Sequence, residues 1–205
     1  MKAMILMDKV AISRPELTLP EAEAERLRAA YAQARVVLEY GSGGSTVMGA
    51  GMPGKRIFSV ESDPDWAQMM RDWFAENPPA KGSEAQIIWS DIGPTKAWGH
   101  PKDSKEYLRY ARYPLEVWDL PEFEQPDVVL VDGRFRPGCA MAAALRTEKP
   151  VTVFIDDYAK RKHYHRVEKY LGQPKLTGRM AEFAVSRMRF EARDLLTLID
   201  MMTRP

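Results

Sequence analysis

The sequence lacks the features that mark several classes of protein. Its single cysteine, Cys139, excludes an internal disulfide and any zinc or iron–sulfur site built from several cysteines. The 30 lysines and arginines are balanced by 29 aspartates and glutamates, so the basic excess of a general nucleic-acid binder is missing. No apolar run approaches the roughly 18 residues of a membrane span. We therefore expect no nucleic-acid partner and no membrane partner.

The start of the chain has no targeting signal that we recognise. The apolar residues 1–7 are followed at once by Asp8 and Lys9, which makes this stretch too short for the core of a signal peptide. The composition, 45% hydrophobic and 29% charged, is that of an ordinary globular protein. We expect a cytoplasmic protein with one domain over residues 1–205, of which residues 1–20 form an N-terminal extension.

Short apolar segments alternate with helical stretches along the chain. Continuous apolar strands are typical of a parallel sheet that is covered on both faces. Alternation of such strands with helices predicts a doubly wound, mostly parallel α/β sheet, with its ligand at the carboxyl ends of the strands. The expected strands are residues 35–40, 56–61, 86–89, 127–132 and 151–155, and the expected helices include residues 21–34, one capped by Asp63, one that begins near Cys139, and residues 192–202.

Three glycines follow the first strand, at Gly41, Gly43 and Gly44. They allow a tight turn and close approach of a ligand. The dinucleotide-binding pattern G-x-G-x-x-G would need a third glycine where Thr46 stands. The carboxylate of Glu39, two places before the turn, would repel a pyrophosphate and attract a cationic ligand.

The other strand ends carry further acids. Glu61 stands 20 residues after Gly41. A carboxylate there can accept hydrogen bonds from the hydroxyls of a ribose, whether the ribose belongs to a dinucleotide or to another nucleoside cofactor. Asp132 and Gly133 end the fourth strand. The cations of Arg134 and Arg136 follow and either bind an anionic substrate or remain solvated.

The pattern Glu39-x-Gly41-x-Gly43, together with the strand that ends at Asp132, resembles the class I S-adenosylmethionine-dependent methyltransferases, a Rossmann-like family. The resemblance implies S-adenosyl-L-methionine as cofactor and transfer of its methyl group to an oxygen or nitrogen of a small molecule. It also implies that Glu39, Gly41, Gly43 and Gly44 hold the methionine end of the cofactor, Glu61 the ribose, and Asp91 and Ile92 the adenine, with Asp132 beside the methyl group. The remaining predicted cofactor-binding residues are Ser42, Thr46 and Ser62.

The catalytic candidates are Asp132, Asp157 and His100. Asp132, Asp156 and Asp157 are similar to the divalent-cation ligands of the catechol-O-methyltransferase-like branch. We favour the simpler interpretation, in which one acid caps a helix and the other lines the pocket, and assign no metal ligand.

Residues 92–126 are expected to be an acceptor-side insertion. Their tyrosines and Trp98 look too polar for the core and indicate either a lid or aromatic packing. The family usually has a sixth and a seventh antiparallel strand. Residues 180–186 can supply one, but we locate no other.

Two alternative functions remain open, an NAD(P)-dependent oxidoreductase and a non-catalytic module that binds a nucleoside cofactor. A homo-oligomer is also left open. Because six acids fall at predicted strand ends, we expect an acidic cleft in a chain of net charge +1.

Overall fold

The computed structural model describes residues 13–205. The expectations for the apolar start of the chain and for most of the N-terminal extension lie outside these residues.

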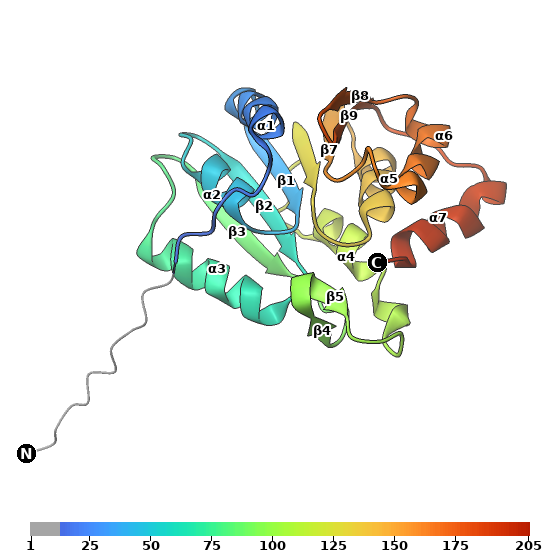
Figure 1. The fold of residues 1–205 in the computed structure, drawn as a ribbon, viewed down its shortest axis with the longest axis horizontal. Helices are drawn as coiled ribbons and strands as arrows, with labels where there is room; N and C mark the ends of the chain where they lie inside the picture. The colour runs from blue at the N-terminus through green and yellow to red at the C-terminus, as the bar shows by residue number, and fades with distance from the viewer. Residues whose placement is uncertain (1–12) are drawn as a thin grey trace, which may run out of the picture.

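A sheet of seven strands forms the centre of the described chain, in the order β3-β2-β1-β6-β7-β9-β8 (Figure 1). The strands are β1 (Val36–Tyr40), β2 (Arg56–Glu61), β3 (Glu84–Trp89), β6 (Val128–Val131), β7 (Val151–Ile155), β8 (Lys175–Thr177) and β9 (Met180–Val185). The first five in spatial order are parallel, whereas β9 runs antiparallel to β7 and β8. The doubly wound, mostly parallel sheet is therefore confirmed, with all five predicted parallel strands.

The strand that we could not locate in the sequence is β8. It has three residues, pairs with β9 through a hairpin, and forms the edge of the sheet. Lys175 and Leu176 are exposed, so this strand has no apolar pattern to reveal it.

Helices cover both faces of the sheet (Figure 1). The strands alternate between two cores: Val37 and Leu130 pack with α1, whereas Leu38 and Val129 pack with α5 and α7. The helices are α1 (Glu21–Gln33), α2 (Gly44–Ala50), α3 (Pro64–Glu76), α4 (Arg112–Leu115), α5 (Arg136–Arg146), α6 (Glu168–Leu171) and α7 (Leu195–Thr203). None of the helices in residues 13–205 has the length and apolar character to cross a membrane.

The stretch between β3 and β6 is more buried than we expected. It holds a short hairpin of β4 (Thr95–Lys96) and β5 (His100–Pro101), followed by α4. Tyr113 is fully buried, and Tyr110 and Trp118 join the same core. The expectation that the aromatic residues of this stretch are too polar for the core is wrong for Tyr110 and Tyr113, whereas Trp98 and Tyr107 are exposed. The buried rings find partners for their polar atoms, as when the Trp118 indole donates to the hydroxyl of Tyr40 at 2.7 Å.

Candidate active site

The glycine turn after β1 touches the turn after β6. Gly41 has φ +103°, a conformation that favours glycine, and a Cβ at this position would lie 2.8 Å from the backbone nitrogen of Gly133. The two turns therefore meet backbone to backbone, which brings the carboxyl ends of β1 and β6 together.

The next two glycines have different reasons for lacking a side chain. A Cβ on Gly44 would lie 2.2 Å from the backbone of Glu16, because residues 15–19 cross the start of α2. We call residues 15–19 the strap. In Figure 1 the chain passes α2 here on its way to α1. A Cβ on Gly43 would have no atom within 4 Å, so this glycine faces open space.

Glu39 lies beneath the glycine turn and is fully buried. Its carboxylate accepts hydrogen bonds from the Tyr31 hydroxyl at 2.8 Å and from the Thr46 hydroxyl, whose oxygen accepts from the Gly43 backbone N–H at 3.0 Å. Burial raises the pKa of Glu39, and these hydrogen bonds act against the rise. Glu39 and Thr46 thus hold the turn from below, and neither lines the cavity above it.

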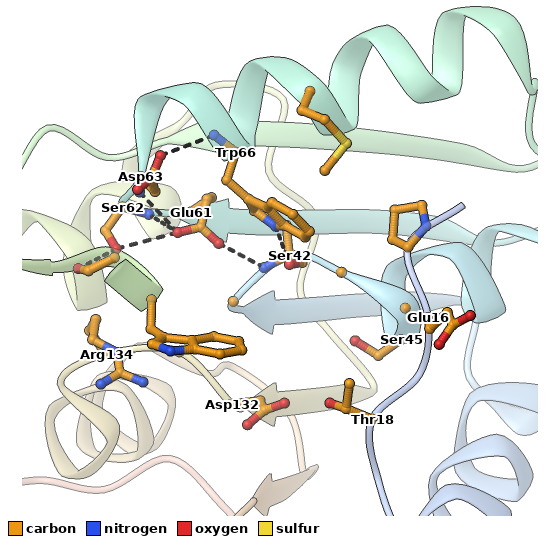
Figure 2. Close-up of a pocket in the computed structure, with 18 of the residues that line it drawn as sticks. Glu16, Thr18, Ser42, Ser45, Glu61, Ser62, Asp63, Trp66, Asp132 and Arg134 are labelled. Carbon is orange, nitrogen blue, oxygen red and sulfur yellow. Dashed lines mark hydrogen bonds between the residues drawn. The ribbon is translucent and has the colours of Figure 1, made fainter. Parts of the chain in front are cut away.

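Glu61 ends β2 with its carboxylate held by backbone. Its Oε1 accepts from the N–H groups of Ser62 at 2.7 Å and Asp63 at 2.9 Å, and its Oε2 accepts from the N–H of Ser42 at 3.2 Å (Figure 2). Burial raises the pKa of Glu61, whereas the backbone hydrogen bonds favour its charged form. Because a carboxylate oxygen has two lone pairs, Oε2 keeps one for a ligand.

These strand ends enclose a cavity of about 690 Å³, which we call the strand-end pocket. Its walls come from the strap, the turns after β1, β2 and β6, the first half of α3, and the segment around Trp98. Figure 2 shows Glu61 and Asp132 on opposite sides of the open space, with Thr18 facing Asp132. The charged residues that line it are Glu16, Glu61, Asp63, Asp65, Asp132 and Arg134. Five acids against one base make the pocket acidic, although only Glu61 and Asp132 belong to the six acids from which the cleft was predicted.

Asp132 titrates near neutrality. Burial and the nearby Asp156 and Asp157 raise its pKa to about 7, although Arg136, with Nη2 3.1 Å from Oδ1, acts in the opposite direction. A pKa near the working pH suits a group that accepts a proton in catalysis.

Tryptophans form the apolar part of the pocket. Trp66 stands near the start of α3, and its indole N–H donates to the Ser42 carbonyl at 2.8 Å. Trp98 is 87% exposed at the pocket rim and has φ +64°, a left-handed conformation that is uncommon for a bulky residue.

The pocket gathers Gly41, Ser42, Gly43, Gly44, Glu61, Ser62 and Asp132 from the predicted site. The predicted adenine contacts, Asp91 and Ile92, are not brought to it. Asp91 accepts from the Gly93 N–H at 2.9 Å and from Arg109 at 3.1 Å, and Ile92 is 1% exposed within the core.

Asp156 and Asp157 also lie outside the pocket, because arginines hold them. Asp156 accepts from Arg179 at 2.9 and 2.7 Å. Asp157 accepts from Arg161 at 3.1 Å and lies 3.5 Å from Arg136.

Within residues 13–205, no group of three His, Cys, Asp or Glu side chains is placed to hold a metal ion. The third catalytic candidate, His100, lies against Arg134 in a separate cavity.

Sequence reasoning missed the strap and Trp66 as pocket residues, whereas Tyr113, one of the tyrosines for which a lid was left open, does line the pocket. The spacing of Trp66, Met69, Met70 and Trp73 indicated one buried helix face. Met70 and Trp73 are indeed buried, but Trp66 is 42% exposed and lines the pocket. Its place directly after the Glu61 strand end was the signal that could have found it.

The fold matches that of solved structures. A methyltransferase-like protein from Silicibacter pomeroyi is 55% identical, with a TM-score of 0.92, over 94% of this chain and 99% of its own.

Two O-methyltransferases share the fold at low identity. The enzyme TomG from Streptomyces achromogenes, in complex with SAM, has 16% identity and a TM-score of 0.52, over 83% of this chain and 82% of its own. An enzyme from Bacillus cereus, in complex with SAH, has 11% identity and a TM-score of 0.52, over 81% of this chain and 82% of its own. No protein-family model matches the chain, and no curated protein matches its sequence.

Proposed function

The chain belongs to the class I S-adenosylmethionine-dependent methyltransferase family, and from this premise we propose that it methylates an oxygen or nitrogen of a small-molecule acceptor. The observation that carries the proposal is the strand-end pocket, where the glycine turn, Glu61 and Asp132 line one cavity. Its volume of about 690 Å³ is typical of small-molecule and cofactor sites.

The pocket residues fit the cofactor. The free lone pair of Glu61 Oε2 can accept a ribose hydroxyl, and the space beside Gly43 admits the ligand close to the backbone. Trp66 and Met69 offer an apolar surface to the adenine ring of the cofactor. The acidic lining, Asp132 above all, favours a cation. When bound, S-adenosylmethionine supplies a methyl group on a positively charged sulfur.

In this proposal, catalysis depends mainly on alignment of the acceptor with the methyl group. The strap forms one wall of the pocket, and Trp98 stands at its rim. The carboxylate of Asp132, with a pKa of about 7, accepts the proton that the acceptor oxygen or nitrogen releases. Asp157 and His100 do not line the strand-end pocket, so Asp132 is the base that we propose.

No observation favours the oxidoreductase alternative. Thr46 stands where a dinucleotide-binding turn has its third glycine, and its hydroxyl is bonded to Glu39 and to the backbone of Gly43. The fold gives no reason to read this turn as a pyrophosphate site.

The test is isothermal titration calorimetry with S-adenosylhomocysteine, on the wild type and on Gly43→Ala. Gly43 has φ 170°, which any residue adopts, and an added methyl group would meet no protein atom within 4 Å. Gly43→Ala should therefore fold normally and bind at least about tenfold more weakly, because the methyl group occupies ligand space.

The matched control is Gly51→Ala, at the exposed end of α2, where the new Cβ would make ordinary contacts at 3.4 Å. Its affinity should equal that of the wild type. Tight binding of NADH without binding of S-adenosylhomocysteine contradicts the proposal, and so does the absence of methyl transfer across a panel of hydroxylated and amino acceptors.

A further inference from the structure

A second, smaller cavity adjoins the strand-end pocket at Gly133 and Arg134, which line both cavities. Its volume is about 60 Å³, and we call it the arginine cavity. The charged and titratable side chains that line it are Arg134, Arg136, Arg161, Arg166, Arg204, His100 and His163. Among the residues that the structure describes, no acidic side chain lines it.

The surrounding acids do not balance these cations. Asp157 is shared between Arg136 and Arg161, and it also lies 3.4 Å from Arg179. Asp200 is shared between Arg166 and Arg204. With Asp132 on Arg136, three aspartates contact the five arginines that line the cavity. The arginine cavity therefore carries an excess of positive charge.

Arg134 has no carboxylate partner in residues 13–205. Its Nη1 is hydrogen-bonded to Nε2 of His100, and its buried Nε has no hydrogen-bond partner among the described residues. Burial and the neighbouring Arg136 lower the pKa of Arg134, and burial and Arg134 lower the pKa of His100. Arg134 is a half-buried cation without a counter-charge, which is unfavourable, and an anion in the cavity would relieve this.

The size of the cavity defines the anion. A volume of about 60 Å³ is small, which favours a single charged group as the occupant. Guanidinium groups bind carboxylate and phosphate through paired hydrogen bonds. Arg136 and Pro137 from the first turn of α5 form one wall, and the positive end of that helix adds to the attraction.

We propose that the arginine cavity binds the carboxylate or phosphate group of the methyl acceptor, which makes the acceptor an anionic small molecule. This inference rests on the proposed function, because it takes the strand-end pocket as the site of methyl transfer. Since Gly133 and Arg134 belong to both cavities, a molecule anchored by its anion in the arginine cavity can extend its reactive atom toward Asp132.

The test measures binding of inorganic phosphate and, separately, of acetate to the full chain by calorimetry at low ionic strength, with and without S-adenosylhomocysteine. We expect at least one anion to bind the wild type. Arg134→Gln and Arg161→Gln should each weaken that binding at least tenfold. Arg161 is half-exposed, so its variant keeps the test valid should Arg134→Gln fail to fold.

The matched control is Arg35→Gln. Arg35 directly precedes β1, at the amino end of the strand, so this variant removes the same charge away from the cavity and should leave anion binding unchanged. A second arm compares methyl transfer to pairs of hydroxylated compounds that differ only in a carboxylate or a phosphate. The anionic member should react at least tenfold faster, and this preference should vanish in Arg161→Gln.

The outcomes separate the two proposals. Binding of S-adenosylhomocysteine without binding of either anion overturns the arginine cavity and leaves the proposed function intact. Anion binding without binding of S-adenosylhomocysteine overturns the proposed function, and the role in acceptor recognition with it. Anion binding that Arg134→Gln and Arg161→Gln leave unchanged also overturns the assignment.

Discussion

The strand-end pocket and the arginine cavity adjoin at Gly133 and Arg134 but have opposite charge. Five acids and one base line the first, whereas five arginines and no acidic side chain line the second in the described chain. The acids at the ends of β1 and β2, Glu39 and Glu61, accept hydrogen bonds from hydroxyl and backbone groups. The acids after β7 meet guanidinium groups instead.

The difference teaches that an acid at a strand end does not by itself make an acidic site. Neutral donors leave the charge of a carboxylate available to a ligand, whereas an arginine offsets it. Asp132 lies between these two cases, because it contacts Arg136 and yet lines the strand-end pocket. The chain with net charge +1 thus contains two adjoining cavities, one suited to a cation and one to an anion.

The largest expected effect on stability and ligand binding comes from a substitution at Gly133, which lines both cavities. A Cβ on Gly133 would lie 2.1 Å from the hydroxyl oxygen of Tyr113, which is fully buried, and 2.9 Å from the nitrogen of Gly41. Gly133→Ala should lower the free energy of unfolding by about 1–3 kcal/mol. It should also abolish binding of both S-adenosylhomocysteine and phosphate.

Chemical denaturation and calorimetry measure these two effects, and Gly51→Ala serves again as the control. Full affinity in either cavity of the Gly133 variant would show that the contact with Tyr113 does not shape that cavity.

A large effect confined to one cavity is expected for Glu61→Gln. The amide replaces one acceptor oxygen by a donor that faces backbone N–H groups or the ligand. Binding of S-adenosylhomocysteine should weaken by roughly 10–100-fold, equivalent to about 1.5–3 kcal/mol. Phosphate binding should stay unchanged. Glu122→Gln, at an exposed position before β6, is the control for the lost charge.

A smaller effect should appear with pH at Asp132. This carboxyl group, near Arg136, Asp156, Asp157 and Arg179, is mostly protonated below its pKa of about 7 and charged above it. Only the charged form attracts a sulfonium. The affinity for S-adenosylmethionine relative to S-adenosylhomocysteine should therefore rise roughly three- to tenfold from pH 6 to pH 8.

Because both ligands carry the same amino acid and nucleoside, their ratio isolates the charge on sulfur. In Asp132→Asn the ratio should be low and flat with pH. An unchanged slope in this variant would assign the titration to another group.

The smallest effect concerns the counter-charge of the arginine cavity. Asp200 pairs with both Arg166 and Arg204 and is 35% exposed. Asp200→Asn should increase phosphate affinity by roughly two- to fivefold at low ionic strength, with little change in S-adenosylhomocysteine binding. The exposed Asp72→Asn on α3 is the control. A decrease in affinity would mean that Asp200 orients the arginines more than it neutralises them.

The sequence predicted most of the fold, because its strands are continuous apolar runs. β2 and β7 begin and end at the predicted residues, and β6 differs by one residue at each end. Asp63 caps α3 as expected, accepting from the N–H groups of Asp65 and Trp66. β8 was not predicted, because an exposed edge strand of three residues has no periodic pattern of apolar residues.

The site was only partly predictable. Glycines and acids at strand ends are local patterns, and the structure gathers most of them in one pocket. The arginine cavity is not local, because its cations come from residues 134, 136, 161, 166 and 204. The sequence also does not reveal which acid each arginine meets, so the pairing of Asp156 with Arg179 depends on the tertiary fold.

Trp98 gives the molecule an optical reporter of its own. It is 87% exposed at the rim of the strand-end pocket, whereas Trp73 and Trp118 are buried. Indole fluorescence shifts to shorter wavelength when the ring loses contact with water. A ligand that fills the pocket and covers Trp98 should therefore shift the emission spectrum to shorter wavelength. This shift can be followed without a label and on the timescale of binding.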